Sequence, residues 1–304
     1  MGRIDEALKR AAGAHSTGPS SAQQELFVSA WGGAKPAAVS APAPPAREAA
    51  PAIPRFERAR NEKPTPERNG SLARLSAEWG KRLVTAGNPE PALVEQFRRL
   101  AAALHKAQSA QDIKVVMVTS ATPADGKTLT AVNLALVLSG SYKRRVLLID
   151  ADLRRPTIGE AAGFKNAVGL SEALKGRDEQ KLQLIPVTPT LTLLPAGQPD
   201  PDPLAGLTSP RMRHILEDAA SNFDWVILDA PPVGLLADAG LMADVVQGTV
   251  FVVRAGHSQF PSVRSAIDAL GHERLLGIVL NGVESGAGEI YGSGYKYVSA
   301  EGRS

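Results

Sequence analysis

The sequence predicts an α/β fold built on a doubly wound, mostly parallel sheet. From about residue 112 onward, short runs of Val, Ile and Leu alternate with segments of helical periodicity. Near-continuous apolar strands separated by helices are typical of a parallel sheet that is covered on both faces. The expected strands are Ile113–Ser120, Arg145–Asp150, Leu191–Leu194, Trp225–Asp229, Thr249–Arg254 and Leu275–Asn281, and the expected helices cover residues 126–139, 209–221, 235–245 and 261–270.

The composition is that of a globular protein, with 43% hydrophobic and 21% charged residues. The absence of cysteine excludes disulfides, zinc–thiolate sites and a cysteine nucleophile. The first residues lack the apolar core of a signal peptide, and no run of 18 apolar residues occurs, so we expect a cytoplasmic protein without a transmembrane segment. The net charge of +3 is concentrated in the N-terminal third, and the mildly acidic remainder argues against nucleic-acid binding.

The N-terminal part of the chain lacks the large apolar residues that a core requires. Residues 1–12 predict a short amphipathic helix, which is either a docking element or a fraying start. Residues 13–88 are rich in Ala, Pro and Ser and predict a disordered linker. The folded domain is expected at 89–285, beginning with an amphipathic helix at 89–108, and a flexible tail should follow at 286–304.

A phosphate-binding loop is predicted between the first expected strand and the following helix. The stretch Ser120-Ala-Thr-Pro-Ala-Asp-Gly-Lys-Thr128 ends in Gly-Lys-Thr, although Ala121 stands where the standard pattern has glycine. Amide N–H groups at a helix N-terminus favour an anion; Lys127 would reach the β- and γ-phosphates and the Thr128 hydroxyl would hold Mg²⁺. The predicted nucleotide contacts are Thr122, Pro123, Ala124, Asp125, Gly126, Lys127, Thr128 and Leu129.

Two acidic strand ends accompany this loop. Four apolar residues lead into Asp150, which is followed by Asp152, and four others lead into Asp229. An apolar strand ending in Asp is the Walker B form, which places a carboxylate near the Mg²⁺ that bridges the phosphates. A single such Asp could merely cap a helix. A loop and two acidic strand ends in a consistent order favour phosphoryl transfer, because that chemistry needs positioning, a metal and charge neutralisation.

These motifs resemble those of the bacterial P-loop tyrosine autokinases (BY-kinases) of exopolysaccharide and capsule biosynthesis. The resemblance runs from about Pro91 to the end of the chain. Residues 119–128 resemble the family's Walker A motif, which often has Ala at its first position. Leu148-Ile-Asp-Ala-Asp-Leu-Arg-Arg-Pro156 resembles the distinctive Walker A′ motif, and Leu228–Pro232 resembles Walker B. Further family blocks are matched by Gly169–Leu174, Leu194–Gly197 and Val252–Gly256.

The resemblance implies a P-loop NTPase fold of the ParA/MinD-like type that uses ATP and Mg²⁺. It implies that Lys127, Asp150 and Asp152 are catalytic, with the two aspartates assisting the metal or activating the attacking hydroxyl. Thr128, Asp150 and Asp229 are the implied metal ligands. Asn281 is the implied adenine contact, and Arg154 and Arg155 would engage either phosphate or a neighbouring subunit.

The tyrosines of the tail are the phosphoacceptors that the resemblance implies. Tyr291, Tyr295 and Tyr297 lie among Gly, Ser and Lys. The alternative interpretation is a disordered tail whose aromatic residues have no function. Members of the family phosphorylate such clusters between subunits of a ring. The family's oligomerising helix reads Glu-x-x-Arg-x-x-Arg, and here Glu95 and Arg98 match but Ala101 does not, so Arg99 is the residue that could substitute in part.

The start of the chain, Arg3–Arg10, resembles free-standing kinases of this group. These kinases work with a separate membrane chain-length or polymerisation protein as activator, which implies a location peripheral to the inner membrane, and a cognate tyrosine phosphatase is expected. Two other interpretations stay open. A ParA/MinD-type positioning ATPase would carry a lysine at the position of Thr122 and no tyrosine tail, whereas a non-catalytic, nucleotide-switched scaffold for polysaccharide export could share every motif.

Overall fold

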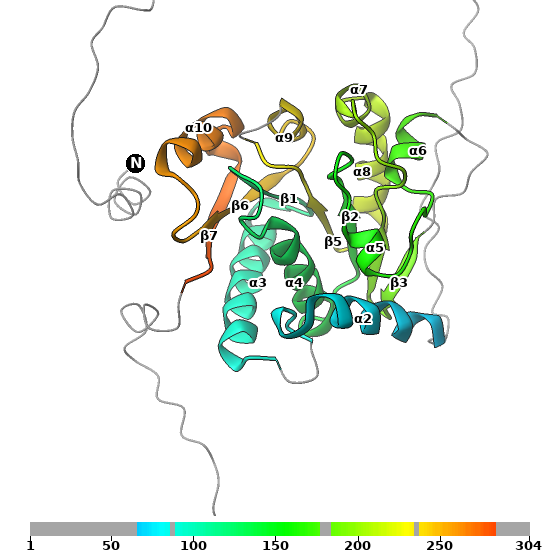
Figure 1. Cartoon of the computed structure of the whole chain (residues 1–304). Helices are drawn as coiled ribbons and strands as arrows, with labels where there is room; N and C mark the ends of the chain where they lie inside the picture. The colour runs from blue at the N-terminus through cyan, green and yellow to red at the C-terminus, as the bar shows by residue number, and fades with distance from the viewer. Residues whose placement is uncertain (1–65, 86–88, 177–183, 234–236, 284–304) are drawn as a thin grey trace, which may run out of the picture. The chain divides into compact units, whose positions relative to one another are not determined.

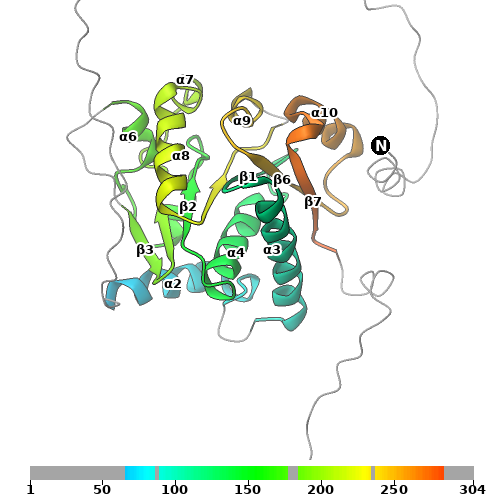
Figure 2. The same cartoon turned by 180° about the vertical axis from the view of Figure 1, so that it is seen from behind.

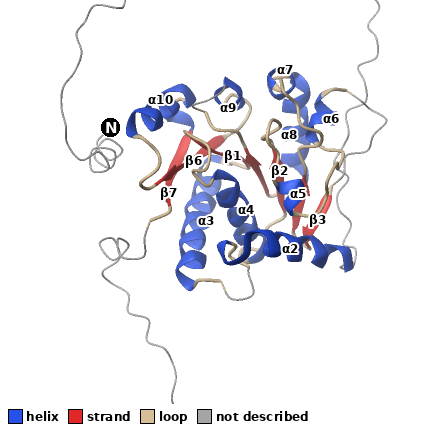
Figure 3. Cartoon of the chain, in the orientation of Figure 1, coloured by secondary structure: helices blue, strands red, loops and turns tan. Residues whose placement is uncertain are grey.

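The computed structural model describes residues 66–85, 89–176, 184–233 and 237–283, which form a seven-stranded sheet flanked by helices (Figures 1 and 3). The strand order is β3-β4-β2-β5-β1-β6-β7, and every pair is parallel except β3 with β4. This confirms the predicted mostly parallel sheet. The strands are β1 Val115–Ser120, β2 Val146–Asp150, β3 Ile185–Thr188, β4 Leu191–Leu194, β5 Trp225–Asp229, β6 Gly248–Arg254 and β7 Leu275–Asn281.

Helices cover both faces of the sheet, as Figures 1 and 2 show from opposite sides. One apolar cluster joins the sheet to α2, α3, α4 and α5, and the other joins it to α6 through α10. This arrangement is the doubly wound one that the sequence predicts. The helices are α2 Pro66–Trp79, α3 Pro91–Gln111, α4 Lys127–Gly140, α5 Ile158–Ala161, α6 Leu170–Leu174, α7 Leu204–Leu207, α8 Pro210–Asn222, α9 Ala237–Met242 and α10 Phe260–Leu270, with short 3₁₀ turns η1 Gly80–Arg82 and η2 His272–Arg274.

Helix α4 follows the phosphate loop directly and forms the centre of one layer. Its residues from Thr130 to Ser139 are all buried. A helix that is apolar around its whole circumference is stable only when it is covered on every side. Here the sheet covers one side, while α3 and residues 80–84 cover others. The N-terminus of α4 is therefore held rigidly at the carboxyl edge of the sheet.

The expected linker at 13–88 is wrong for its last part, because residues 66–85 belong to the folded domain. Leu75, Leu83 and Val84 are buried against α4 and the sheet. The Asn133 side chain of α4 accepts a hydrogen bond from the Val84 amide (2.9 Å) and donates one to the Arg82 carbonyl (2.8 Å). The segment has few large apolar residues, as a linker does, and it is ordered because other elements offer it a complementary apolar surface.

Other short elements also escaped prediction. Strand β3 contains Pro186, which is tolerated because β3 lies at the edge of the sheet. Helices α5, α6 and α7 have only four or five residues each, too few to establish a helical period. The expectations for residues 1–65 and 286–304 lie outside the described residues. In the part of the chain that is described, no helix combines the length and apolarity needed to cross a membrane.

Candidate active site

Strand register brings the predicted carboxylates together at the carboxyl edge of the sheet. In the parallel β2–β5 pair, Asp150 lies directly beside Asp229. Strand β1 pairs with the other side of β5 and leads into the phosphate loop, so Lys127 begins α4 next to the same two acids. The side chains of Asp150 and Asp229 are both fully buried. The fold thus brings these residues together at one edge of the sheet.

Lys127 is the cation of this acidic cluster. Its Nζ donates to Asp152 Oδ2 at 2.8 Å and to Thr128 Oγ1 at 3.3 Å, and it lies 3.7 Å from Asp229 Oδ1. Burial by itself would lower the pKa of Lys127, but the surrounding carboxylates outweigh this effect and raise the pKa above its ordinary value. The lysine is therefore charged at neutral pH, and its present partner is Asp152.

The Asp150 carboxylate has one oxygen engaged and one oxygen without a partner. Oδ2 accepts the amide N–H groups of Thr157 (3.1 Å) and Ile158 (3.0 Å), which anchors the carboxylate to the start of α5. Oδ1 is buried and has no hydrogen-bond partner among the described residues. Burial, reinforced by the neighbouring Asp229, raises the pKa of Asp150 to about 7. This carboxyl group can therefore exchange a proton near neutral pH.

The cluster fits a magnesium ion that arrives together with phosphates. Both oxygens of the buried Asp229 also lack hydrogen-bond partners within the described residues, and burial raises the pKa of this group. Within the described ranges, no group of three or more His, Cys, Asp or Glu side chains could hold a metal alone. Mg²⁺ does not require one, because it commonly binds through one or two carboxylates plus phosphates and water. The Asp229 oxygens and the Thr128 hydroxyl suit this mode, while Asp150 Oδ1 can serve either as a further ligand or as a proton acceptor, but not as both.

The phosphate loop is organised around a buried acid. Asp125 is fully buried, and its carboxylate accepts hydrogen bonds from the amide of Thr122 (3.0 Å) and from its hydroxyl (3.1 Å). The loop then turns through positive φ at Ala124 (65°) and Gly126 (96°) before α4 begins. The Asp125 side chain thus points into the protein and shapes the loop. Pro123 and Ala124 are exposed, and Leu129 is partly buried against the core.

Asn281, the implied adenine contact, lies against the phosphate loop. Its Nδ2 donates to the Asp125 carbonyl at 2.8 Å. A contact with adenine stays a prediction. Sequence reasoning had not connected Asn281 with the loop, because the two are 156 residues apart in the chain. It had likewise given no role to Arg254, although this residue lies within the Val252–Gly256 block and also contacts the loop.

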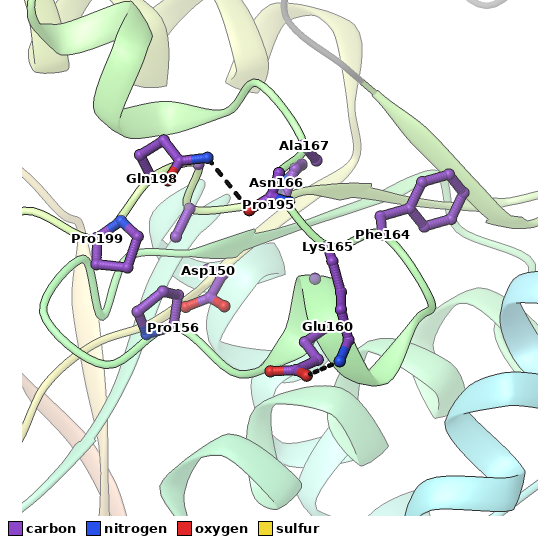
Figure 4. A pocket seen from close by; sticks show the side chains of 13 residues that line it. Asp150, Pro156, Glu160, Phe164, Lys165, Asn166, Ala167, Pro195, Gln198 and Pro199 are labelled. Carbon is purple, nitrogen blue, oxygen red and sulfur yellow. Dashed lines mark hydrogen bonds and ion pairs between the residues drawn. The ribbon is translucent and has the colours of Figure 1, made fainter.

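A cavity of about 230 Å³ opens beside Asp150 (Figure 4). Its wall is polar and apolar in similar measure: it includes three prolines and Phe164, and an ion pair between Glu160 and Lys165 (2.7 Å) lies at one side. The lining comes from α5 and from loops at 164–167 and 195–199, which are distant in sequence. Some of these residues belong to the motifs at 148–156 and 194–197, but nothing in those motifs indicates that they enclose a cavity. The prolines are Pro156, Pro195 and Pro199.

No protein-family model matches the chain. The tyrosine-protein kinase YwqD of Bacillus subtilis is 35% identical over 216 residues, which cover 70% of this chain and 90% of YwqD. This chain belongs to the family of bacterial tyrosine-protein kinases. The tyrosine-protein kinase Wzc of Salmonella typhimurium is 32% identical over 204 residues, or 66% of this chain, but those residues span only 28% of Wzc.

Solved kinase domains agree with this family membership. The kinase domain of Escherichia coli tyrosine kinase ETK superposes with a TM-score of 0.60 at 34% identity, covering 68% of this chain and 80% of that domain. The BceF tyrosine kinase domain gives a TM-score of 0.59 at 31% identity, covering 72% and 90%. The predicted fold class and the predicted class of enzyme, a protein-tyrosine kinase, are both confirmed.

Helix α3 of this kinase carries the residues that were matched to an oligomerising helix. Arg98 is exposed, and Arg99 forms a largely exposed ion pair with Glu95 at 3.5 Å. Ala101, at the third position of the family pattern, is fully buried in the core. The core leaves no room for an arginine side chain at position 101. The alanine at this position is therefore explained by the packing of α3 against the domain. A role of this helix in oligomerisation stays a prediction.

Proposed function

We propose that the protein is an ATP- and Mg²⁺-dependent tyrosine autokinase that acts in exopolysaccharide synthesis or export. It would transfer the γ-phosphate to tyrosines in the tail of a neighbouring copy. The observation that carries the proposal is the position of Asp150, which belongs to the acidic cluster around Lys127 and also lines a separate cavity. The proposed site for ATP, the phosphoryl donor, and the proposed site for tyrosine, the acceptor, thus meet at the carboxylate of Asp150.

On the donor side, the loop amides and Lys127 would bind the polyphosphate of ATP. Lys127 would exchange its contact with Asp152 for the β- and γ-phosphates, which neutralises charge during transfer. Thr128 and Asp229 would hold the magnesium ion, which when bound supplies charge neutralisation across the bridging phosphates. Asp152, once its contact with Lys127 is broken, would then be free to help orient the other side chains of this acidic cluster.

On the acceptor side, the cavity suits the ring of a tyrosine. The three prolines in its wall offer apolar surface to the ring, and Asp150 Oδ1 lies buried without a partner among the described residues. The phenolic oxygen would form a bond to the γ-phosphorus while the bond to the β–γ bridging oxygen breaks. ADP leaves, and the phenolic proton passes to Asp150. A pKa of about 7 suits a general base at neutral pH.

Autophosphorylation of the tail tests this function. The full-length chain is incubated with Mg²⁺ and ATP, with and without the cytoplasmic segment of its membrane partner, and phosphotyrosines are mapped by mass spectrometry. We expect label on Tyr291, Tyr295 or Tyr297, which lie outside the described residues, and its loss in Lys127→Met. Lys106→Met, on the exposed side of α3, is the matched control. ATP binding without phosphotyrosine under both conditions would favour a nucleotide-switched scaffold.

We further propose a ring of copies, activated by the membrane chain-length protein and reset by a tyrosine phosphatase. The exposed position of Arg98 and the half-exposed position of Glu95 on α3 support this assembly. Each phosphate added to the tail would contribute roughly −1.5 to −2 charge, which would loosen contacts between mildly acidic domains. Mass photometry before and after phosphorylation should show an oligomer that dissociates. A monomer at every concentration would count against the ring.

A further inference from the structure

Three successive backbone carbonyls of the phosphate loop are bound from outside the loop. The carbonyls belong to residues 123–125, and their donors lie at the ends of β6 and β7, on Arg254, His257 and Asn281. His257 Nε2 donates to the Pro123 carbonyl at 3.2 Å, Arg254 Nη1 to the Ala124 carbonyl at 3.1 Å, and Asn281 Nδ2 to the Asp125 carbonyl at 2.8 Å. None of the three donors belongs to the Walker motifs.

The same loop after β6 also holds the buried acid of the phosphate loop. Ser258 Oγ donates to Asp125 Oδ1 at 2.7 Å and accepts the Arg254 amide at 2.8 Å. The Ala255 amide donates to the Asn281 carbonyl at 2.8 Å, which joins the ends of β6 and β7. The donors are therefore parts of one hydrogen-bonded support that is anchored to the sheet.

Anchoring these carbonyls determines where the loop amides point. The structure has no cis peptide bond among its described residues, so each carbonyl is antiparallel to the N–H of the next residue. Carbonyls turned toward the support thus turn the N–H groups of residues 124–126 to the other side. The amides of Ala124 and Gly126 have no hydrogen-bond acceptor in the described part of the chain. Convergent free amides of this kind bind phosphate.

We propose that Arg254, His257, Ser258 and Asn281 form a carbonyl clamp that preorganises the phosphate loop and sets its affinity for polyphosphate. The clamp residues are positioning residues: they act through the loop carbonyls and Asp125. The inference rests on the proposed function for the identity of the ligand, ATP. It gives Asn281 a different task from the adenine contact expected from the sequence.

The contacts of Asn281 favour the clamp over the adenine contact. Its Oδ1 accepts the Gly282 amide at 2.9 Å, while its Nδ2 is bound to the loop, so both ends of the side-chain amide are already engaged by the protein. The amide also lies directly on Gly126, where an added Cβ would stand 2.0 Å from Nδ2. Glycine at this position is therefore favoured by its positive φ, and any larger residue would displace the Asn281 side chain from the loop.

A polyphosphate ligand that lacks adenine distinguishes the two possible roles of Asn281, the clamp and the adenine contact. Isothermal titration calorimetry of the full-length chain is carried out with inorganic tripolyphosphate and with ATP, both in the presence of Mg²⁺. Each variant then has two dissociation constants, one for each ligand. Ser258→Ala changes no charge and removes one hydrogen bond to a buried carboxylate, so we expect about a ten-fold or greater loss for both ligands. Ser258→Thr should restore both affinities, and Ser221→Ala, on the exposed surface of α8, should change neither.

Asn281→Ala decides between the clamp and the base contact. The clamp requires equal fold-losses for tripolyphosphate and ATP; a loss for ATP alone would overturn it and restore the adenine contact. Unchanged affinities in Ser258→Ala would also overturn it. If Ser258→Ala fails to fold, Asn281→Ala decides alone, because it also changes no charge, and unaltered affinities for both ligands in that variant would overturn the clamp. Phosphotyrosine formation is measured separately. A wild-type chain that binds both ligands without forming phosphotyrosine refutes the kinase proposal and leaves the clamp standing.

Discussion

Replacing Asp150 with asparagine should stabilise the nucleotide-free protein at neutral pH. Asp150 is a fully buried carboxyl group beside another buried acid, and its pKa of about 7 lies well above the ordinary value of 3.8. The folded state therefore holds a proton that the unfolded state has already lost, over the window from about pH 4 to pH 7. Asparagine keeps the shape and one oxygen for the amides of Thr157 and Ile158.

The sign and the size follow from proton linkage. Between the two pKa values the folded state binds more protons than the unfolded state, so the wild-type free energy of unfolding falls as the pH rises and levels off above pH 7. A shift of about three units corresponds to roughly 4 kcal/mol at pH 8. Part of that difference is already present at pH 5. The advantage of Asp150→Asn should therefore grow by about 3 kcal/mol between pH 5 and pH 8.

Urea denaturation of both proteins at a series of pH values, without nucleotide or Mg²⁺, measures this difference. Asp112→Asn, at an exposed site just after α3, is the control, and its free energy of unfolding should change with pH in parallel with that of the wild type. If the free energy of unfolding of Asp150→Asn also changed with pH in parallel with that of the wild type, Asp150 would be ionised in the folded state throughout the range. The assignment of Asp150 as a base of near-neutral pKa would then be untenable.

Three further substitutions test separate parts of the structure. Leu83→Ala should lower the free energy of unfolding by about 2–5 kcal/mol, because Leu83 is fully buried. A loss below about 1 kcal/mol would mean that residues 80–84 do not belong to the core. Gly126→Ala should weaken ATP binding at least about ten-fold with the fold retained, since φ is 96° and the Cβ would meet Asn281; unaltered binding in titration would contradict this loop geometry. Gln198→Trp, on the exposed rim of the cavity, should reduce phosphotyrosine formation while ATP affinity is retained; unchanged phosphotyrosine formation would mean that the cavity does not accept tyrosine.

Much of this protein is determined by local sequence. The boundaries of β4, β5 and β7 agree with the expected strands, because each is a compact apolar run ended by a polar residue or a turn. The convergence of Lys127, Asp150 and Asp229 was also predictable. In a parallel sheet the carboxyl ends of neighbouring strands share one edge, so residues at those ends meet wherever the strands are adjacent.

Tertiary structure alone decided which surfaces these elements meet. The inclusion of residues 66–85 depends on Asn133 and on the apolar face of α4, which no local pattern in that segment reveals. The cavity beside Asp150 is bounded by loops that come together only in the fold. The contact of Asn281 with Asp125 spans 156 residues. Periodicity indicates which side of an element is buried, but its partner is chosen by packing between segments far apart in the chain.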